Sequence, residues 1–185
     1  MKKLSLKLIG LSLIIVLAGC NKAQEIDKPM AKDITDMAEL GVVEYTVTKN
    51  IKANDNQAFY KFGDRKILFS CKAIMKAGID MKDFSREDVE VNDIDNSVVV
   101  TLPKAKILSL NLPPEEAKVV YEKVGTFRGK FSATDRTALL QQGEKAILES
   151  VDEIGILKEA EADAILFIKA FFSQAGYNNI TVNFK

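Results

Sequence analysis

The chain has 185 residues, with 26 basic and 26 acidic side chains and a formal net charge of +0. It contains no histidine and only two cysteines, which excludes His-based catalytic triads, imidazole zinc sites and cysteine-only metal sites. The balanced charge gives no sign of nucleic-acid binding or of a polybasic contact with lipid.

The chain begins with a secretory signal. Three lysines precede an apolar stretch over residues 8–17, which is well short of the roughly 20 residues that span a bilayer. Leu17-Ala18-Gly19-Cys20 follows, and this ending resembles the lipobox of bacterial lipoproteins. The resemblance implies that residues 1–19 are a signal peptide and that Cys20 carries a diacylglyceryl thioether and an N-acyl group. Several acyl chains together would give a stable membrane anchor.

Residues 20–39 are predicted to be the lipidated cysteine and a tether. They are mostly polar, contain Pro29, and as a flexible coil would reach roughly 25 Å. Without the three signal lysines, 23 basic residues remain against 26 acidic ones, a net charge of −3. Asn21 is not the aspartate that, by resemblance to enterobacterial sorting, retains a lipoprotein at the inner membrane. We therefore expect an outer-membrane anchor, with the protein facing the periplasm.

Residues 40–185 are predicted to form one domain. Its first half is predicted to consist of strands. Apolar and polar residues alternate over 43–51 and 66–77, which predicts two strands. A hairpin is predicted over 89–102, because two alternating stretches flank a turn-forming segment. A further extended segment over 104–112 ends at two prolines.

The second half of the domain is predicted to be mainly helical. Pro114 followed by two glutamates predicts a helix that ends near Gly125. A capping box at Ser132 opens a helix predicted to reach residue 154, and a second long helix is expected over 157–175. The alternating residues 180–184 predict a closing strand. The fold class expected is α+β: an N-terminal, mostly antiparallel sheet, then two long helices, and a C-terminal strand returning to the sheet.

Cys71 lies in an alternating stretch, on the same strand face as apolar neighbours. This pattern predicts a buried side chain, because free cysteine is among the most buried residue types. Lys72 would point to the opposite face, so the cationic setting of a reactive thiol is not expected. If Cys20 is lipidated, Cys71 is left alone and cannot form an intramolecular disulfide.

Carboxylates are the remaining candidates for site chemistry. One group is Asp80, Asp83, Glu87 and Asp88, and the pair Asp93 and Asp95 resembles a fragment of a calcium loop. That pair lacks the glycine and the closing glutamate of an EF-hand. Both groups fall where solvated turns are expected. The common hydrolase and nucleotide-binding motifs are absent. No metal, cofactor or catalytic residue is therefore predicted.

An aromatic group precedes the second predicted strand, at Phe59, Tyr60 and Phe62. One interpretation is core packing at the end of a hairpin, which is favoured because aromatics contribute much of core burial. The other is a groove lining or a contact with lipid.

Short stretches across the mature chain carry a second resemblance. They are Ala77-Gly78-Ile79-Asp80-Met81, the hairpin, the segment from Leu102 to Leu108, and the segment from Gly155 to Tyr177. Their order resembles an uncharacterised family of bacterial envelope proteins, classified only as a domain of unknown function and common among lipoproteins of Bacteroidetes-type bacteria. The resemblance implies no catalytic or binding residues.

The leading hypothesis is a non-enzymatic, lipid-anchored envelope protein that binds a partner, such as another envelope protein. The second is a binding module for a small apolar or peptide ligand, and an enzyme that uses carboxylates with Lys or Tyr is the third. A deep pocket at Asp80, Lys72 or Tyr45 would favour the ligand or enzyme hypotheses. A filled core there would favour a partner-binding scaffold.

Overall fold

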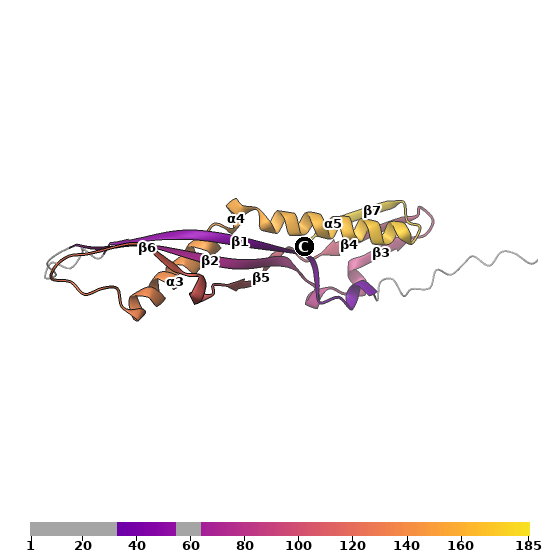
Figure 1. Cartoon of the computed structure of the whole chain (residues 1–185). Coiled ribbons are helices and arrows are strands. Elements are labelled where there is room, and N and C mark those ends of the chain that lie inside the picture. Colours follow the sequence, from indigo (N-terminus) through magenta and orange to yellow (C-terminus); the bar gives the residue numbers. More distant parts are fainter. Residues whose placement is uncertain (1–32, 55–63) are drawn as a thin grey trace, which may run out of the picture.

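A computed structural model of the protein describes residues 33–54 and 64–185, and Figure 1 shows an elongated molecule. Its longest elements are two antiparallel strands, β1 (Glu39–Asn54) and β2 (Arg65–Asp80), which pair along nearly their whole length. Sixteen residues in each strand span about 50 Å. We call the end at Asn54 and Arg65 the distal end, and the end at Glu39 and Asp80 the basal end.

β2 is the central strand of the first sheet. β1 pairs with one side of it, and two shorter strands share the other side, β5 (Lys106–Asn111) toward the base and β6 (Lys118–Val124) toward the distal end. All three pairings are antiparallel. A short 3₁₀ turn, η4 (Pro114–Glu116), connects β5 to β6.

A second, three-stranded sheet lies at the basal end. It contains β3 (Val89–Asn92), β4 (Ser97–Leu102) and β7 (Asn179–Phe184), in the order β3-β4-β7. The antiparallel β3–β4 pair confirms the predicted hairpin. β7 pairs in parallel with β4, so the prediction that the closing strand returns to the first sheet was wrong. Alternation marks which face of a strand is apolar, but it does not say which sheet the strand joins.

Three helices lie in the C-terminal part, α3 (Ala133–Leu148), α4 (Val151–Ile154) and α5 (Ile156–Gln174). The predicted capping box is confirmed, since Ser132 and Asp135 bond each other's backbone N–H groups. The continuous helix predicted to residue 154 was wrong. α3 ends at Leu148, where the Ser150 hydroxyl donates a 2.8 Å hydrogen bond to the Ile147 carbonyl and so competes with helical pairing.

The helix predicted from Pro114 to Gly125 was also wrong. Only η4 follows the proline, and residues 118–124 form strand β6. The start signals were present, but Val119, Val120 and Tyr121 favour a strand, and the free side of β2 supplies a partner. The expected α+β arrangement of one sheet, two long helices and a returning strand is thus replaced by two sheets with seven strands among the described residues.

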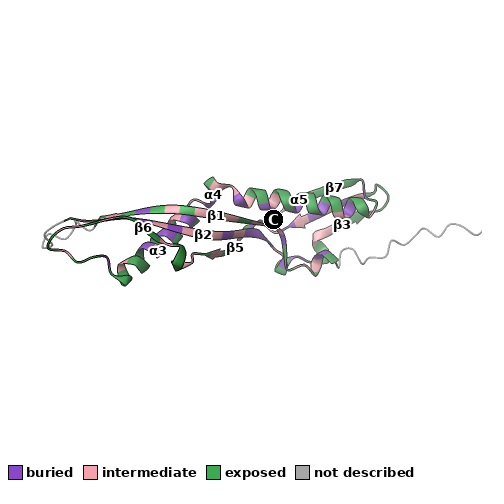
Figure 2. Ribbon diagram, viewed as in Figure 1, coloured by how far each residue is buried: buried purple, intermediate pink, exposed green. Residues whose placement is uncertain are grey.

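The core lies between the helices and one face of the sheets (Figure 2). α3 packs on β1 and β2, and α5 packs on β1, β2 and β7. Cys71 is 1% exposed, which confirms its predicted burial, and this burial raises the pKa of its thiol. The largest fully buried side chains include Met75, Ile168 and Phe172. In residues 33–54 and 64–185, no helix is long and apolar enough to cross a bilayer.

Candidate binding surface at the distal end

The acidic group at the basal end is engaged in local structure. Asp80 accepts a hydrogen bond from the backbone N–H of Lys82 at 3.1 Å, at the start of the 3₁₀ turn η2 (Met81–Asp83). Its carboxylate also lies 2.9 Å from the Lys106 ammonium. The hydrogen bond from Lys106, followed by that from Lys82, holds the pKa of Asp80 below its usual range.

Asp88 plays a similar part in the next 3₁₀ turn, η3 (Arg86–Asp88). It accepts a 2.9 Å hydrogen bond from the Ser85 backbone N–H, and its carboxylate lies 2.6 Å from the Lys185 ammonium. The lysine hydrogen bond lowers the pKa of Asp88. Asp83 and Glu87 are exposed. Across the described parts of the chain, no group of three or more His, Cys, Asp or Glu side chains could hold a metal ion.

The fragment that resembles a calcium loop lies in the turn between β3 and β4. Asp93 accepts a 3.3 Å hydrogen bond from the Tyr177 hydroxyl, and Asp95 accepts one of 3.0 Å from the Asn92 side chain. Burial, and then the neighbouring Asp93 carboxylate, raise the pKa of Tyr177. The Asp93 carboxylate therefore links the turn to the segment that follows α5, whereas the Asp95 carboxylate is bonded within the hairpin.

Two further candidates are paired on the surface. The Tyr45 hydroxyl donates a hydrogen bond to Glu159 of α5, and this bond raises the pKa of Tyr45. Lys72 lies 3.8 Å from Glu116, and both side chains are almost half exposed. Within the described residues, Tyr45 and Lys72 point to opposite faces of the first sheet, so these two side chains do not converge on one site.

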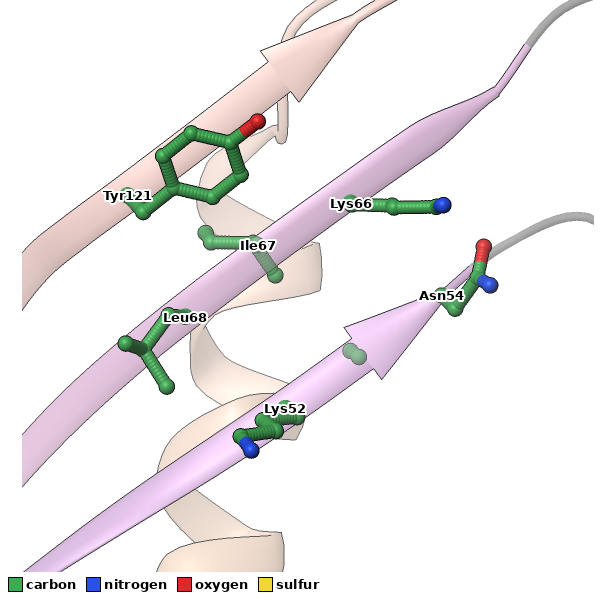
Figure 3. Close-up of a pocket in the computed structure, with 7 residues that line it drawn as sticks. Lys52, Asn54, Lys66, Ile67, Leu68 and Tyr121 are labelled. Carbon is green, nitrogen blue, oxygen red and sulfur yellow. The ribbon is translucent and has the colours of Figure 1, made fainter.

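A pocket lies instead at the distal end of the first sheet, on its side away from α3 (Figure 3). Its volume is about 320 Å³. In Figure 3 the Tyr121 ring lies along β6 with its hydroxyl pointing toward the distal end, as does the Lys66 side chain. The lining residues come from β1, β2 and β6: Lys52, Ala53, Asn54, Lys66, Ile67, Leu68 and Tyr121.

Strand register arranges the side chains of this face in two rows. In one row Leu68 of β2 lies between Lys52 of β1 and Tyr121 of β6. In the next row, two residues further along β2, Lys66 lies between Asn54 and Lys123. Residues two apart in a strand point to the same face, so the row with Leu68 and Tyr121, which ends in Lys52, adjoins a basic row that contains Lys66 and Lys123.

Charge is unevenly distributed along the molecule. The distal segments 49–54, 64–70 and 118–131 contain eight basic and two acidic residues. The basal segments 79–105 and 178–185 contain seven acidic and four basic ones. The formal net charge of +0 thus conceals a basic distal end, which raises the local concentration of anionic partners.

Large apolar side chains are exposed at the same end. Val120 is 58% exposed, Tyr121 53% and Phe127 86%. Clustered apolar exposure beside polar groups is typical of an interaction site. Strand register places five of the exposed or lining side chains on one face of the sheet, and we call this set, Lys52, Lys66, Leu68, Tyr121 and Lys123, the distal surface.

The distal surface was not predicted from the sequence. The helix predicted over residues 114–125 separated Tyr121 and Lys123 from β2, although the run Val119-Val120-Tyr121 favours a strand. The predicted aromatic group Phe59, Tyr60 and Phe62 and the predicted lipidation site Cys20 lie outside the described residues.

The fold and surface define an elongated two-sheet domain with C-terminal helices and a basic, partly apolar distal end. The chain belongs to the family described as "Protein of unknown function (DUF4230)", whose model matches residues 32–182. No curated protein and no solved structure matches the chain. Family membership supports the predicted resemblance to a domain of unknown function and assigns no activity.

Proposed function

We propose that this protein is a lipid-anchored envelope protein that binds a partner protein through the distal surface and catalyses no reaction. The observation that carries the proposal is the combination of basic and exposed apolar side chains at one end of an otherwise balanced chain. Charged groups of one sign steer partners to a surface, and aromatic side chains supply contact area.

The anchor part of the proposal rests on the lipobox resemblance at Cys20. Replacing Cys20 with alanine should abolish labelling by radioactive palmitate and release the protein from the membrane fraction, because no other cysteine is available near the cleavage site. Continued labelling and membrane retention of the variant would contradict the anchor.

The direction of β1 relates the anchor to the distal surface. The described chain begins at residue 33 beside the basal end, where the Met81 N–H bonds the Ala38 carbonyl. From there β1 runs about 50 Å to the distal end. A lipid at Cys20 would therefore join the domain at its base. We propose that the partner meets the opposite end, which would face away from the outer membrane into the periplasm.

Site-specific photo-crosslinking in intact cells tests the partner part of the proposal. A photoreactive amino acid at Tyr121 should give a reproducible crosslinked protein, since this side chain is exposed within the distal surface. The matched control is Ile94, which is 93% exposed in the β3–β4 turn at the basal end. If position 121 yields no reproducible partner, binding through the distal surface is contradicted.

A further inference from the structure

We propose that the partner contributes an acidic segment with an apolar side chain. The apolar side chain enters the distal pocket, and neighbouring carboxylates pair with Lys52, Lys66 and Lys123. This inference rests on the proposed function and adds the chemistry of the bound segment.

The shape and lining of the pocket indicate the apolar part of the segment. Leu68, Ala53, Ile67 and the Tyr121 ring give it a largely apolar surface. Its volume of about 320 Å³ is near the lower limit of ligand pockets, which run from about 300 to 1,000 Å³. That volume accommodates one large side chain of a bound segment.

The lysines around the pocket indicate the charge of the segment. Lys66 and Lys123 are directly opposed in the β2–β6 pairing, and like charges in this position destabilise a sheet. Within the described residues, Lys52 and Lys123 have no ion-pair partner. Lys66 has only Asp64 at 3.8 Å, where both side chains are about half exposed and the attraction is weak. Carboxylates placed among the three ammonium groups would relieve this repulsion.

The hollow shape of the distal pocket favours a protein segment, rather than an anionic bilayer, as the bound partner. A membrane surface would attract the lysines through anionic headgroups that are spread over a broad plane. The distal pocket is instead a local, largely apolar hollow bounded by three strands. A peptide can place one side chain in the pocket and its neighbours on the basic row. In an extended peptide the side chains two residues before and after the inserted one point to the same face, so carboxylates at those positions can reach the lysines.

Peptide binding to the full-length protein in neutral phosphatidylcholine nanodiscs tests the inference. The probe is a fluorescent peptide of Glu-Glu-Phe repeats, compared with Glu-Glu-Ser and Lys-Lys-Phe repeats, and empty nanodiscs give the background. Fluorescence anisotropy should show saturable binding of the Glu-Glu-Phe peptide only. Binding should weaken as salt rises, because exposed charges are screened.

Two variants test the contribution of charge and the contribution of the apolar pocket separately. Lys66→Glu should raise the Kd by about tenfold or more, because it repels the acidic probe at the centre of the basic row. Lys104→Glu is its matched control, since Lys104 is exposed at the basal end, and it should leave the Kd unchanged. Tyr121→Ala should remove the preference for Phe over Ser in the probe.

Several results of these binding and crosslinking experiments would overturn the inference. Equal binding of the acidic and basic probes, or a Kd that Lys66→Glu leaves unchanged, would overturn the inference. So would lysine-dependent binding to phosphatidylglycerol vesicles without binding of the peptide, which would assign the surface to a membrane. A partner crosslinked at position 121 with a yield that Lys66→Glu does not alter would leave the proposed function intact and overturn only the acidic segment.

Discussion

Replacing Gly41 with alanine should lower the free energy of unfolding by about 3 kcal/mol or more. Gly41 has a φ of +60°, where an L-residue costs roughly 1–2 kcal/mol. A Cβ atom there would also lie 2.3 Å from the Ala160 carbonyl oxygen and 3.0 Å from the Ala164 Cβ, so α5 would be forced away from β1. Loss of this packing accounts for the rest of the effect.

Urea denaturation followed by circular dichroism measures this loss. Gly129→Ala is the matched control, because a Cβ at Gly129 meets no atom within 4 Å and its φ is not positive. The control should change stability by less than about 0.5 kcal/mol. Equal stabilities of the two variants would show that α5 does not approach β1 as closely as the structure describes.

Replacing Phe172 with alanine should cost about 3–5 kcal/mol, the usual range for a buried phenylalanine. Phe172 is 2% exposed on α5, where its ring packs edge-to-face on Phe171 at 5.4 Å and on Tyr177 at 6.0 Å. The cavity left by the ring would lie in the main core cluster, so the surrounding side chains could refill it only partly.

The control for Phe172 comes from the same helix. Leu166 is 65% exposed, and Leu166→Ala should change the free energy of unfolding by less than about 0.5 kcal/mol. Thermal and urea unfolding of both variants provide the comparison. A larger loss at Leu166 than at Phe172 would mean that the outer side of α5 is covered, contrary to the described fold.

Local elements were predictable where one residue pattern determined one structure. Alternation located β1 and β2, turn residues located the β3–β4 hairpin, and the Ser132 box located the start of α3. Cys71 was placed in the core because its strand neighbours on the same face are apolar. These features depend on neighbours in sequence, which a single chain displays directly.

Long-range choices were not predictable from local pattern. The alternating residues of β7 are compatible with either sheet. Its parallel pairing with β4 depends on where α5, the preceding element, ends in space. Residues 118–124 combined helix-start signals with β-branched residues, and the free side of β2 decided between them. This was also why the distal surface could not be predicted, since Tyr121 and Lys123 reach it only through β6.

The net charge of the chain did not predict the basic distal surface, because that surface also depends on which strands pair. A formal net charge of +0 pointed away from any basic contact, whereas the register of β1, β2 and β6 brings Lys52, Lys66 and Lys123 onto one face. Separated lysines form a surface only after strand pairing. The carboxylates that drew attention in the sequence, such as Asp80 and Asp88, proved instead to be bonded within turns.

The ratio of crosslinking yields at positions 121 and 94, in the same intact cells and with the full-length protein, tests partner binding at the distal surface most directly. Both side chains are exposed, so accessibility alone cannot account for a large difference. The account predicts one reproducible partner protein, with a yield at position 121 several times that at position 94. Equal yields, or a partner captured only at position 94, would contradict it.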